Sequence, residues 1–356
     1  MTALALGCSP AKNRTTTPTD GTISSNDDGT AQGSKSYAPP GYRDLAIGMN
    51  VPNLEQALPF YEDVMGARVI QRLYGPDHVL WNARVMVGDT ALIMTNADSH
   101  HRSPAEVGGS PLRFFLYVED GKAVYDRAIA AGAEPLQPIR DLFWGDRAGQ
   151  VRDPSGHIWY IGTHIEDISN EEFTRRAREE IALFAAGKTP KWELRPTASD
   201  YKPPGAMSVT PTAIVDDVEA AIAFYPQALS ASVIRRVDDA EGTAIFSELR
   251  LGDSLLRVTK SYPEYEHKSA PSLGGTPAGF YLYVPVVEQT CDTAVEHHAG
   301  LIHPVIDPSF GERFCSLADT LGMVWGVATF VEPVSPEVMQ ERFLEFLSQF
   351  VEGGTH

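Results

Sequence analysis

The segment FWGDRAGQVRDPSGHIWYIGTHIED, residues 143–167, gathers carboxylate, imidazole, phenol and indole side chains within a short span. Three of its residues are candidate catalytic groups, because each can transfer a proton: Tyr160, His157 and Asp146. His157 and His164 would lie about 23 Å apart on one extended strand, so they cannot share a metal ion. The segment is therefore either an active site or a hairpin whose polar residues serve the fold.

The rest of the chain shows that this segment belongs to a repeated unit. VPNLEQALPFY (51–61) corresponds to VDDVEAAIAFY (215–225) at an offset of 164 residues. FLYV (115–118) corresponds to YLYV (281–284), and DPSGHIW (153–159) to DTLGMVW (319–325), both at an offset of 166 residues. The unbroken order indicates an internal duplication, with a two-residue insertion in the second copy between Asp253 and Ser269.

Each copy contains the same series of predicted elements twice. LAIGMNV (45–51) alternates apolar and small or polar residues, as a half-buried strand does, and a helix follows between Asn53 and Gly66. Three short strands complete this βαβββ unit. A second βαβββ unit runs to residue 164, and its DPSG sequence (153–156) predicts a β-turn before the last strand.

Paired βαβββ units with FYxxVxG after the first strand and DPxGHxW before the last resemble the vicinal oxygen chelate superfamily. This superfamily includes glyoxalase I, extradiol dioxygenases and bleomycin-resistance proteins, and the resemblance covers about residues 43–167 and 207–333. The run GGSP, FLYVED, FWGDR and DPSGH resembles the bacterial subgroup loosely labelled glyoxalase/bleomycin-resistance proteins. The implied fold class is α+β, with two tandem domains, each a pair of βαβββ units that form a curved, cup-like mixed sheet with helices outside. The expected domains are 37–187 and 207–350, each with a C-terminal helix, joined by the Pro-rich linker 188–206.

In metal-using members of the superfamily, His and Glu from the first, fourth, fifth and last strands hold a divalent cation in the cup. The resemblance places these positions at Ala46, Met94, Arg113 and Tyr160 in the first domain, and at Thr210, Val258, Gly279 and Gly326 in the second. A hard or borderline cation needs three or four oxygen or imidazole ligands, which neither set supplies. No cofactor is therefore expected, and a divalent cation in a rearranged site is the alternative.

Without a metal, the cups would present aromatic rings and a few polar groups, as a small-molecule site does. The expected ligand-binding residues are Asn50, Trp81, Met94, Arg113, Phe115, Tyr117, Trp144, Tyr160, Tyr281 and Tyr283. Arg113 could pair with an anionic or carbonyl-bearing ligand through its fork of donors. The competing interpretation is that the aromatic residues are core and that Arg113 is paired with a carboxylate of the chain.

Three functions follow from these observations. The preferred one is metal-independent binding of a small organic ligand, in the manner of bleomycin-resistance proteins, for sequestration or sensing. The second is an enzyme, a lyase, isomerase or dioxygenase, that uses Tyr160, His157 or Asp146 in a rearranged site. The third is a non-catalytic scaffold in which the two copies form an intrachain pseudo-dimer, either monomeric or further paired as a homodimer.

Charge and apolar content limit the partners. The net charge of −18 argues against nucleic acid as a partner, and no apolar run is long enough to span a bilayer. Residues 9–36 are polar, so residues 1–36 are expected to be a disordered tether, with a lipoprotein-like GCS sequence at Cys8. The protein would be lipid-anchored at Cys8 if the true start lies upstream, and cytoplasmic otherwise. Cys291 and Cys315 have no metal or disulfide motif and are expected to be small buried apolar residues.

Overall fold

The computed structural model describes residues 36–188, 190–307 and 310–352. The predicted N-terminal tether, with Cys8, lies outside these ranges apart from Ser36. None of the helices in the described ranges is long and apolar enough to cross a membrane.

Both copies contain the predicted series of strands and helices, with an additional short helix between the two βαβββ units. The first copy consists of β1 (Leu45–Val51), α1 (Leu54–Met65), β2 (Arg68–Tyr74), β3 (Leu80–Val87), β4 (Thr90–Asn96), α2 (Pro104–Val107), β5 (Leu112–Tyr117), α3 (Gly121–Ala130), β6 (Glu134–Asp141), β7 (Asp146–Arg152), β8 (Ile158–His164) and α4 (Asn170–Ala185). The second copy consists of β9 (Val209–Val215), α5 (Val218–Leu229), β10 (Ser232–Asp238), β11 (Ala244–Leu251), β12 (Ser254–Lys260), the 3-10 turn η1 (Pro263–Tyr265), α6 (Ala270–Leu273), β13 (Ala278–Tyr283), α7 (Val287–Glu296), β14 (Gly300–Ile306), β15 (Glu312–Ala318), β16 (Val324–Phe330) and α8 (Pro336–Glu352).

The α+β fold class is confirmed, but the units pair across the two copies. The first sheet has the order β14-β15-β16-β13-β1-β4-β3-β2, and the second has the order β10-β11-β12-β9-β5-β8-β7-β6. β1 pairs antiparallel with β13, and β5 pairs antiparallel with β9. The expectation that each domain forms a cup from its own two units is therefore wrong. Because duplication makes the units equivalent, each first strand can pair with the matching edge strand of the other copy.

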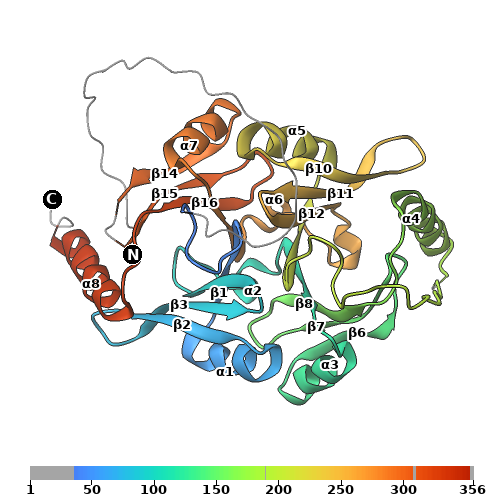
Figure 1. The fold of residues 1–356 in the computed structure, drawn as a ribbon, viewed down its shortest axis with the longest axis horizontal. Helices are drawn as coiled ribbons and strands as arrows, with labels where there is room; N and C mark the ends of the chain where they lie inside the picture. Colours follow the sequence, from blue (N-terminus) through green and yellow to red (C-terminus); the bar gives the residue numbers. More distant parts are fainter. Residues whose placement is uncertain (1–35, 189, 308–309, 353–356) are drawn as a thin grey trace.

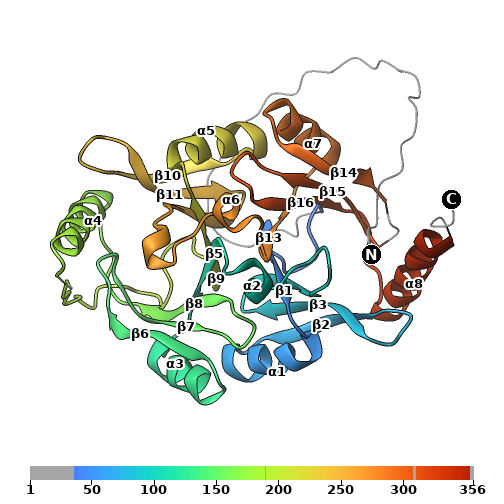
Figure 2. The same cartoon turned by 180° about the vertical axis from the view of Figure 1, so that it is seen from behind.

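Helices α1, α3, α5 and α7 cover the convex faces of the two sheets (Figures 1 and 2). Helices α1 and α3 lie together on one side of the molecule, and α5 and α7 lie together on the other. The extension helices α4 and α8 lie at opposite ends of the molecule, at the open sides of the second and first sheet respectively. We call the concave face of the first sheet the first cup, and that of the second sheet the second cup.

The predicted alternation along β1 separates the core from the cup. Leu45, Ile47 and Met49 are buried in the core between sheet and helices, whereas Ala46 packs with the side chains of the first cup. The predicted ends of α1 are confirmed: the Asn53 side chain accepts a hydrogen bond from the Gln56 amide, and Gly66 adopts φ +67°.

The DPSG turn binds the two units of a domain to each other. The carboxylate of Asp153 accepts hydrogen bonds from the Tyr61 hydroxyl at 2.7 Å and from Trp159 Nε1 at 2.9 Å, and also from the backbone amides of Ser155 and His157. In the second copy, Asp319 accepts the equivalent bonds from Tyr225 and Trp325, at 2.8 and 2.9 Å. This part of the opening segment therefore serves the fold, because the same contacts occur in both copies.

One expectation about the cysteines is wrong. Cys291 on α7 and Cys315 on β15 form a disulfide across 24 residues of sequence. The sequence has no local signal for this pair, because the two cysteines are brought together by the packing of α7 against β15. Both side chains are buried, as expected, but they are covalently joined.

Candidate functional site

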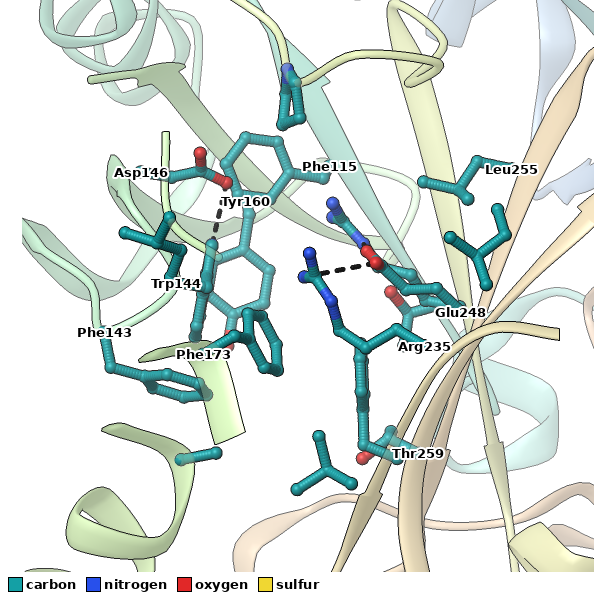
Figure 3. Close-up of a pocket in the computed structure, with 18 of the residues that line it drawn as sticks. Phe115, Phe143, Trp144, Asp146, Tyr160, Phe173, Arg235, Glu248, Leu255 and Thr259 are labelled. Carbon is teal, nitrogen blue, oxygen red and sulfur yellow. Dashed lines mark hydrogen bonds and ion pairs between the residues drawn. The ribbon is translucent and has the colours of Figure 1, made fainter. Parts of the chain in front are cut away.

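A cavity of about 480 Å³ lies over the concave face of the second sheet, beneath α4. The second unit of the first copy supplies one wall and the first unit of the second copy supplies the other (Figure 3). The site is therefore built at the junction of the two copies. Neither copy alone contains both walls.

The first wall is aromatic. The Trp144 and Tyr160 rings meet edge to face with centroids 6.1 Å apart, and Phe115 is nearly parallel to Tyr160 at 5.9 Å. Phe173 of α4 and Phe143 extend this surface toward the mouth of the cavity, and Figure 3 shows these rings facing Arg235, Glu248 and Leu255. Such a surface favours a planar or apolar ligand body.

The opposite wall carries two arginines that share one carboxylate. Glu248 accepts a hydrogen bond from Arg257 Nε at 3.0 Å and forms an ion pair with Arg235 Nη1 at 3.2 Å. Arg257 also donates to the Tyr117 hydroxyl at 3.0 Å, and the Arg235 guanidinium lies 4.1 Å from the centre of the Phe173 ring. Two cations against one anion leave this wall with a positive surplus.

Arg113, on β5, is a third cation in the cavity lining. Its side chain is only 4% exposed, and Nη2 donates to the backbone carbonyl of Glu266 at 2.7 Å. Within the described ranges its Nε and Nη1 atoms are buried without a hydrogen-bond partner. Burial lowers the pKa of Arg113 to about 10, so the group remains charged at neutral pH. The neighbouring His267 is neutral there, because burial and the charge of Arg113 lower its pKa to about 4.

Asp146 holds Trp144 in the aromatic wall. Its Oδ2 atom accepts hydrogen bonds from Trp144 Nε1 and from the Tyr117 hydroxyl, both at 2.8 Å. Its Oδ1 atom lies 2.7 Å from Nδ1 of His164, whose Nε2 atom lies 3.0 Å from Asp167. Both carboxylate oxygens are thus engaged by the protein, and we assign Asp146 a positioning role.

His164 provides a test that depends on pH. Burial alone would lower its pKa, but Asp146 and Asp167 outweigh burial, so the folded-state pKa is raised. The stability gained from protonated His164 is therefore fully present below the unfolded pKa of 6.5 and is lost as pH rises through the raised folded value. H164N should cost about 1.5–3 kcal/mol of unfolding free energy at pH 6, because it removes hydrogen bonds made by a charged group.

Urea unfolding of the wild type and H164N at pH 6 and pH 9 measures this difference. The cost should shrink at pH 9, because raising the pH removes the proton from the wild-type imidazole. An equal cost at both pH values would contradict a protonated His164 in the folded protein.

The other two catalytic candidates lie in different surroundings. Tyr160 lines the cavity, and burial raises the pKa of its hydroxyl. His157 does not line the cavity: its Nε2 atom lies 2.9 Å from the Asn50 carbonyl, which joins the two sheets. Burial lowers the pKa of His157. The structure therefore brings Tyr160 and Asp146 to the cavity and separates His157 from it.

The remaining predicted ligand-binding residues divide between the two cups. Arg113, Phe115, Trp144 and Tyr160 line the cavity, and Tyr117 lies beneath it. Four residues belong instead to the first sheet or its edges: Asn50, Trp81, Tyr281 and Tyr283.

Met94 and its counterpart Val258 were expected to face the cups, and this expectation is wrong. Both are fully buried in the core between sheet and helices. Their preceding neighbours, Ile93 and Arg257, lie on the concave faces of the sheets. On β4 and β12, the side chains that face the cups beside the expected positions are therefore those of Ile93 and Arg257.

The corrected positions in the second cup do not fit a metal ion. They are Thr210, Arg257, Arg113 and Tyr160, which place two guanidinium groups where metal-using relatives have anionic or neutral ligands. Positive charges repel a divalent cation and provide no lone pair for coordination. No group of three or more potential His, Cys, Asp or Glu ligands occurs in the part of the chain that the structure describes.

In the first cup, the polar side chains bond to one another. Glu312 forms a bidentate ion pair with Arg84, with N–O distances of 2.7 and 3.0 Å. The hydroxyl groups of Tyr281 and Tyr283 each donate to Glu312 at 2.9 Å. These tyrosines were expected to bind a ligand, but their hydroxyl groups donate hydrogen bonds within the protein.

The side chains at the mouths of the two cups differ in size. In the first cup, Phe343 of α8 contacts Trp81 and Phe310, with ring centroids 6.1 Å apart in each pair. At the equivalent positions of the second cup, Ala177 replaces Phe343 and Ile245 replaces Trp81. Smaller side chains at two of the three positions leave room beneath α4.

The comparisons with known proteins agree with this architecture. The family model for the glyoxalase/bleomycin resistance protein/dioxygenase superfamily matches residues 45–161 and 209–327. Uncharacterised proteins of Mycobacterium bovis and Mycobacterium tuberculosis are each 32% identical over 134 residues, which is 36% of this chain and 88% and 78% of theirs. Glyoxalase I from Zea mays superposes with a TM-score of 0.54 at 15% identity, covering 88% of this chain and 97% of the maize chain. At that identity the likeness shows the fold alone. The two matched segments together span more than half of the chain, which therefore belongs to the glyoxalase/bleomycin resistance protein/dioxygenase superfamily.

Proposed function

We propose that the protein binds a small organic molecule in the second cup without a metal ion, for sequestration or sensing. The observation that carries this proposal is the cavity of about 480 Å³ over the positions that hold metal in other family members. Its volume lies within the range of about 300–1,000 Å³ typical of small-molecule sites. Aromatic and aliphatic side chains form most of its lining, and a few charged groups could orient a ligand.

The side chains around the cavity favour binding over catalysis. Asp146 is fully hydrogen-bonded, His164 is held between two carboxylates, and the raised pKa of Tyr160 disfavours a phenolate. A general base needs a basic atom within reach of the substrate. Asp146 already accepts three hydrogen bonds, both nitrogens of His164 are engaged by carboxylates, and Tyr160 keeps its proton at neutral pH, so none of the three is a ready general base.

Filling the cavity tests the proposal. A177F and I245W each place a side chain of the size found in the first cup into the second cup, so ligand binding should be lost. We would screen a metabolite library by thermal shift in buffer containing EDTA, with the wild type and both variants. A ligand at a hundred times its Kd should stabilise the wild type by about 2.7 kcal/mol and the filled variants by much less.

A182F is the matched control, because Ala182 is exposed on the same helix. It should bind as the wild type does. Ligands that stabilise A177F and the wild type equally would place binding outside the cavity and sink the proposal. A screen without any hit would favour the scaffold hypothesis.

A further inference from the structure

We propose that the ligand is an organic anion with an aromatic body, whose carboxylate or sulfonate group is bound by Arg113. The aromatic body would lie along Trp144 and Tyr160, toward α4. This inference rests on the proposed function, since it names the chemical class that the same cavity would accept.

The guanidinium of Arg113 is buried, and two of its nitrogen atoms have no hydrogen-bond partner among the described residues. A buried charge without a partner is costly, so such groups are normally paired with an opposite charge. The chain has 47 acidic residues against 29 basic ones, yet none of the described carboxylates forms an ion pair with Arg113. The nearby Glu266 gives Arg113 only its backbone carbonyl, while its carboxylate pairs with Arg152 at 3.1 Å. The missing partner of Arg113 is an anion from outside the protein.

The carboxylates that line the cavity are all engaged by groups other than Arg113. The arginines of the lining are Arg113, Arg235, Arg250 and Arg257, and its carboxylates are Asp146, Asp167, Glu180 and Glu248. Glu248 pairs with Arg235 and Arg257, Asp146 and Asp167 flank His164, and Glu180 pairs with Arg140, so none of these carboxylates is left to pair with Arg113. His267, which also lines the cavity, is neutral and adds no charge. The cavity lining is therefore positive near Arg113 although the chain carries a net charge of −18. This local reversal of sign selects anions from solution.

The first cup serves as an internal reference for what the fold requires. The equivalents of Arg113 and Tyr160 in the first cup are Gly279 and Gly326, and the equivalent of Arg257 is Ile93. The fold therefore forms without these side chains. They occur together in the cup whose cavity lies beneath α4, which ties them to a ligand.

The insertion predicted from the change of offset supports the same assignment. It lies in the loop of residues 261–268, which contains the carbonyl that holds Arg113 and the cavity-lining residues Tyr262 and His267. Glu266 adopts φ +58°, a left-handed conformation that costs energy in a residue other than glycine. The shorter loop of the first copy, residues 97–102, belongs to the cup that has a glycine at the position of Arg113. The longer loop thus holds Arg113, which forms no ion pair with a described carboxylate.

Two fluorescent probes with nearly the same aromatic body separate the contributions of charge and shape. 1-Anilinonaphthalene-8-sulfonate carries a sulfonate, and N-phenyl-1-naphthylamine is its neutral counterpart. In buffer with EDTA, we expect the wild type to bind the sulfonate at least about 10-fold more tightly than the neutral probe, as one charged hydrogen-bonded pair would provide. R113M should abolish this preference and leave the Kd of the neutral probe within about twofold.

Two further variants serve as controls. R113K keeps the charge and should retain part of the preference, whereas R236M removes an exposed arginine from the same sheet and should change neither Kd. Added KCl should weaken binding of the sulfonate but not of the neutral probe, which tests the inference in the wild type even if R113M does not fold.

The outcomes separate the inference from the proposed function. Equal affinity of the wild type for both probes, with both excluded by A177F, would overturn the anion inference and leave the cavity as a ligand site. Binding of both probes unaffected by A177F would instead overturn the proposed function. A preference for the sulfonate that persists in R113M would assign anion binding to other residues and also overturn the inference.

Discussion

Replacement of Glu312 by glutamine is expected to lower the free energy of unfolding by about 3–5 kcal/mol, the usual cost of removing one partner from a buried ion pair. The Glu312 side chain is only 4% exposed and carries the bidentate bond from Arg84. E312Q would leave the Arg84 guanidinium buried without a counter-charge. The effect is large because the remaining partners in the cup, Tyr281 and Tyr283, cannot neutralise it.

The pH dependence of this pair follows from the pKa of Glu312. Burial alone would raise it, but the charge and hydrogen bonds of Arg84, with the two tyrosine hydroxyls, bring it below the ordinary value of 4.5. The stability that ionised Glu312 contributes is therefore present above pH 4.5 and is lost as pH falls through the lower folded value. E312Q should lack this acid-sensitive component.

Urea unfolding at pH 7 and pH 4 provides the measurement, with E288Q as the matched control. Glu288 pairs with Arg313 at the surface, where the side chains are 39% and 45% exposed, so its loss should cost no more than about 0.5 kcal/mol. A cost below about 1 kcal/mol for E312Q at pH 7 would mean that water or another group relieves the charge of Arg84.

Arg84 and Arg113 are buried arginines of the two cups that differ in their partners. In the first cup the buried arginine has a carboxylate partner, and two tyrosines complete the network. In the second cup Arg113 has only a carbonyl and faces a cavity. One cup contributes mainly stability, while the other keeps an uncompensated charge that a ligand could satisfy.

Much of the fold could be predicted from the sequence, because local signals agreed with the tertiary structure. The alternation along β1, the Asn53 and Gly66 ends of α1 and the DPSG turn are each determined by residues near one another in the chain. The duplication then extends every such assignment to the second copy. The exchange of units could not be predicted, since equivalent strands of both copies match the same edges equally well.

The register predicted for β4 was wrong for a physical reason. In TALIMTN, Ala91, Leu92, Ile93 and Met94 are all apolar, so no alternation shows which residues face the cup. A one-residue shift exchanges the two faces of the strand. The single arginine in SLLRVTK of β12 was the available signal, because a charge in an apolar strand rarely points into the core.

The parts of the site that the sequence did not reveal come from elements distant in the chain. Phe173 lies on α4, and Arg235 and Glu248 lie on β10 and β11 of the other copy. Their approach to Tyr160 depends on the exchanged pairing of the sheets. Arg113, Phe115, Trp144 and Tyr160 were predictable because the family motifs place them on the strands and loop that form one wall.

The disulfide between Cys291 and Cys315 provides the second large expected effect. C291A/C315A should lower the free energy of unfolding by about 2–4 kcal/mol, because the bond restricts the unfolded chain across a loop of 24 residues. Reduction of the wild type with dithiothreitol should produce a loss of similar size. Urea unfolding with and without reductant measures both.

C8S is the control for the third cysteine, which lies outside the described residues, and it should leave the unfolding curve and its response to reductant unchanged. The double variant C291A/C315A should not respond to dithiothreitol at all, since it has no disulfide to lose. A wild-type stability that is insensitive to reductant, with three free thiols on titration, would contradict the disulfide. Because such bonds persist mainly in oxidising compartments, finding it intact in protein isolated from its native source would favour export over the cytoplasm.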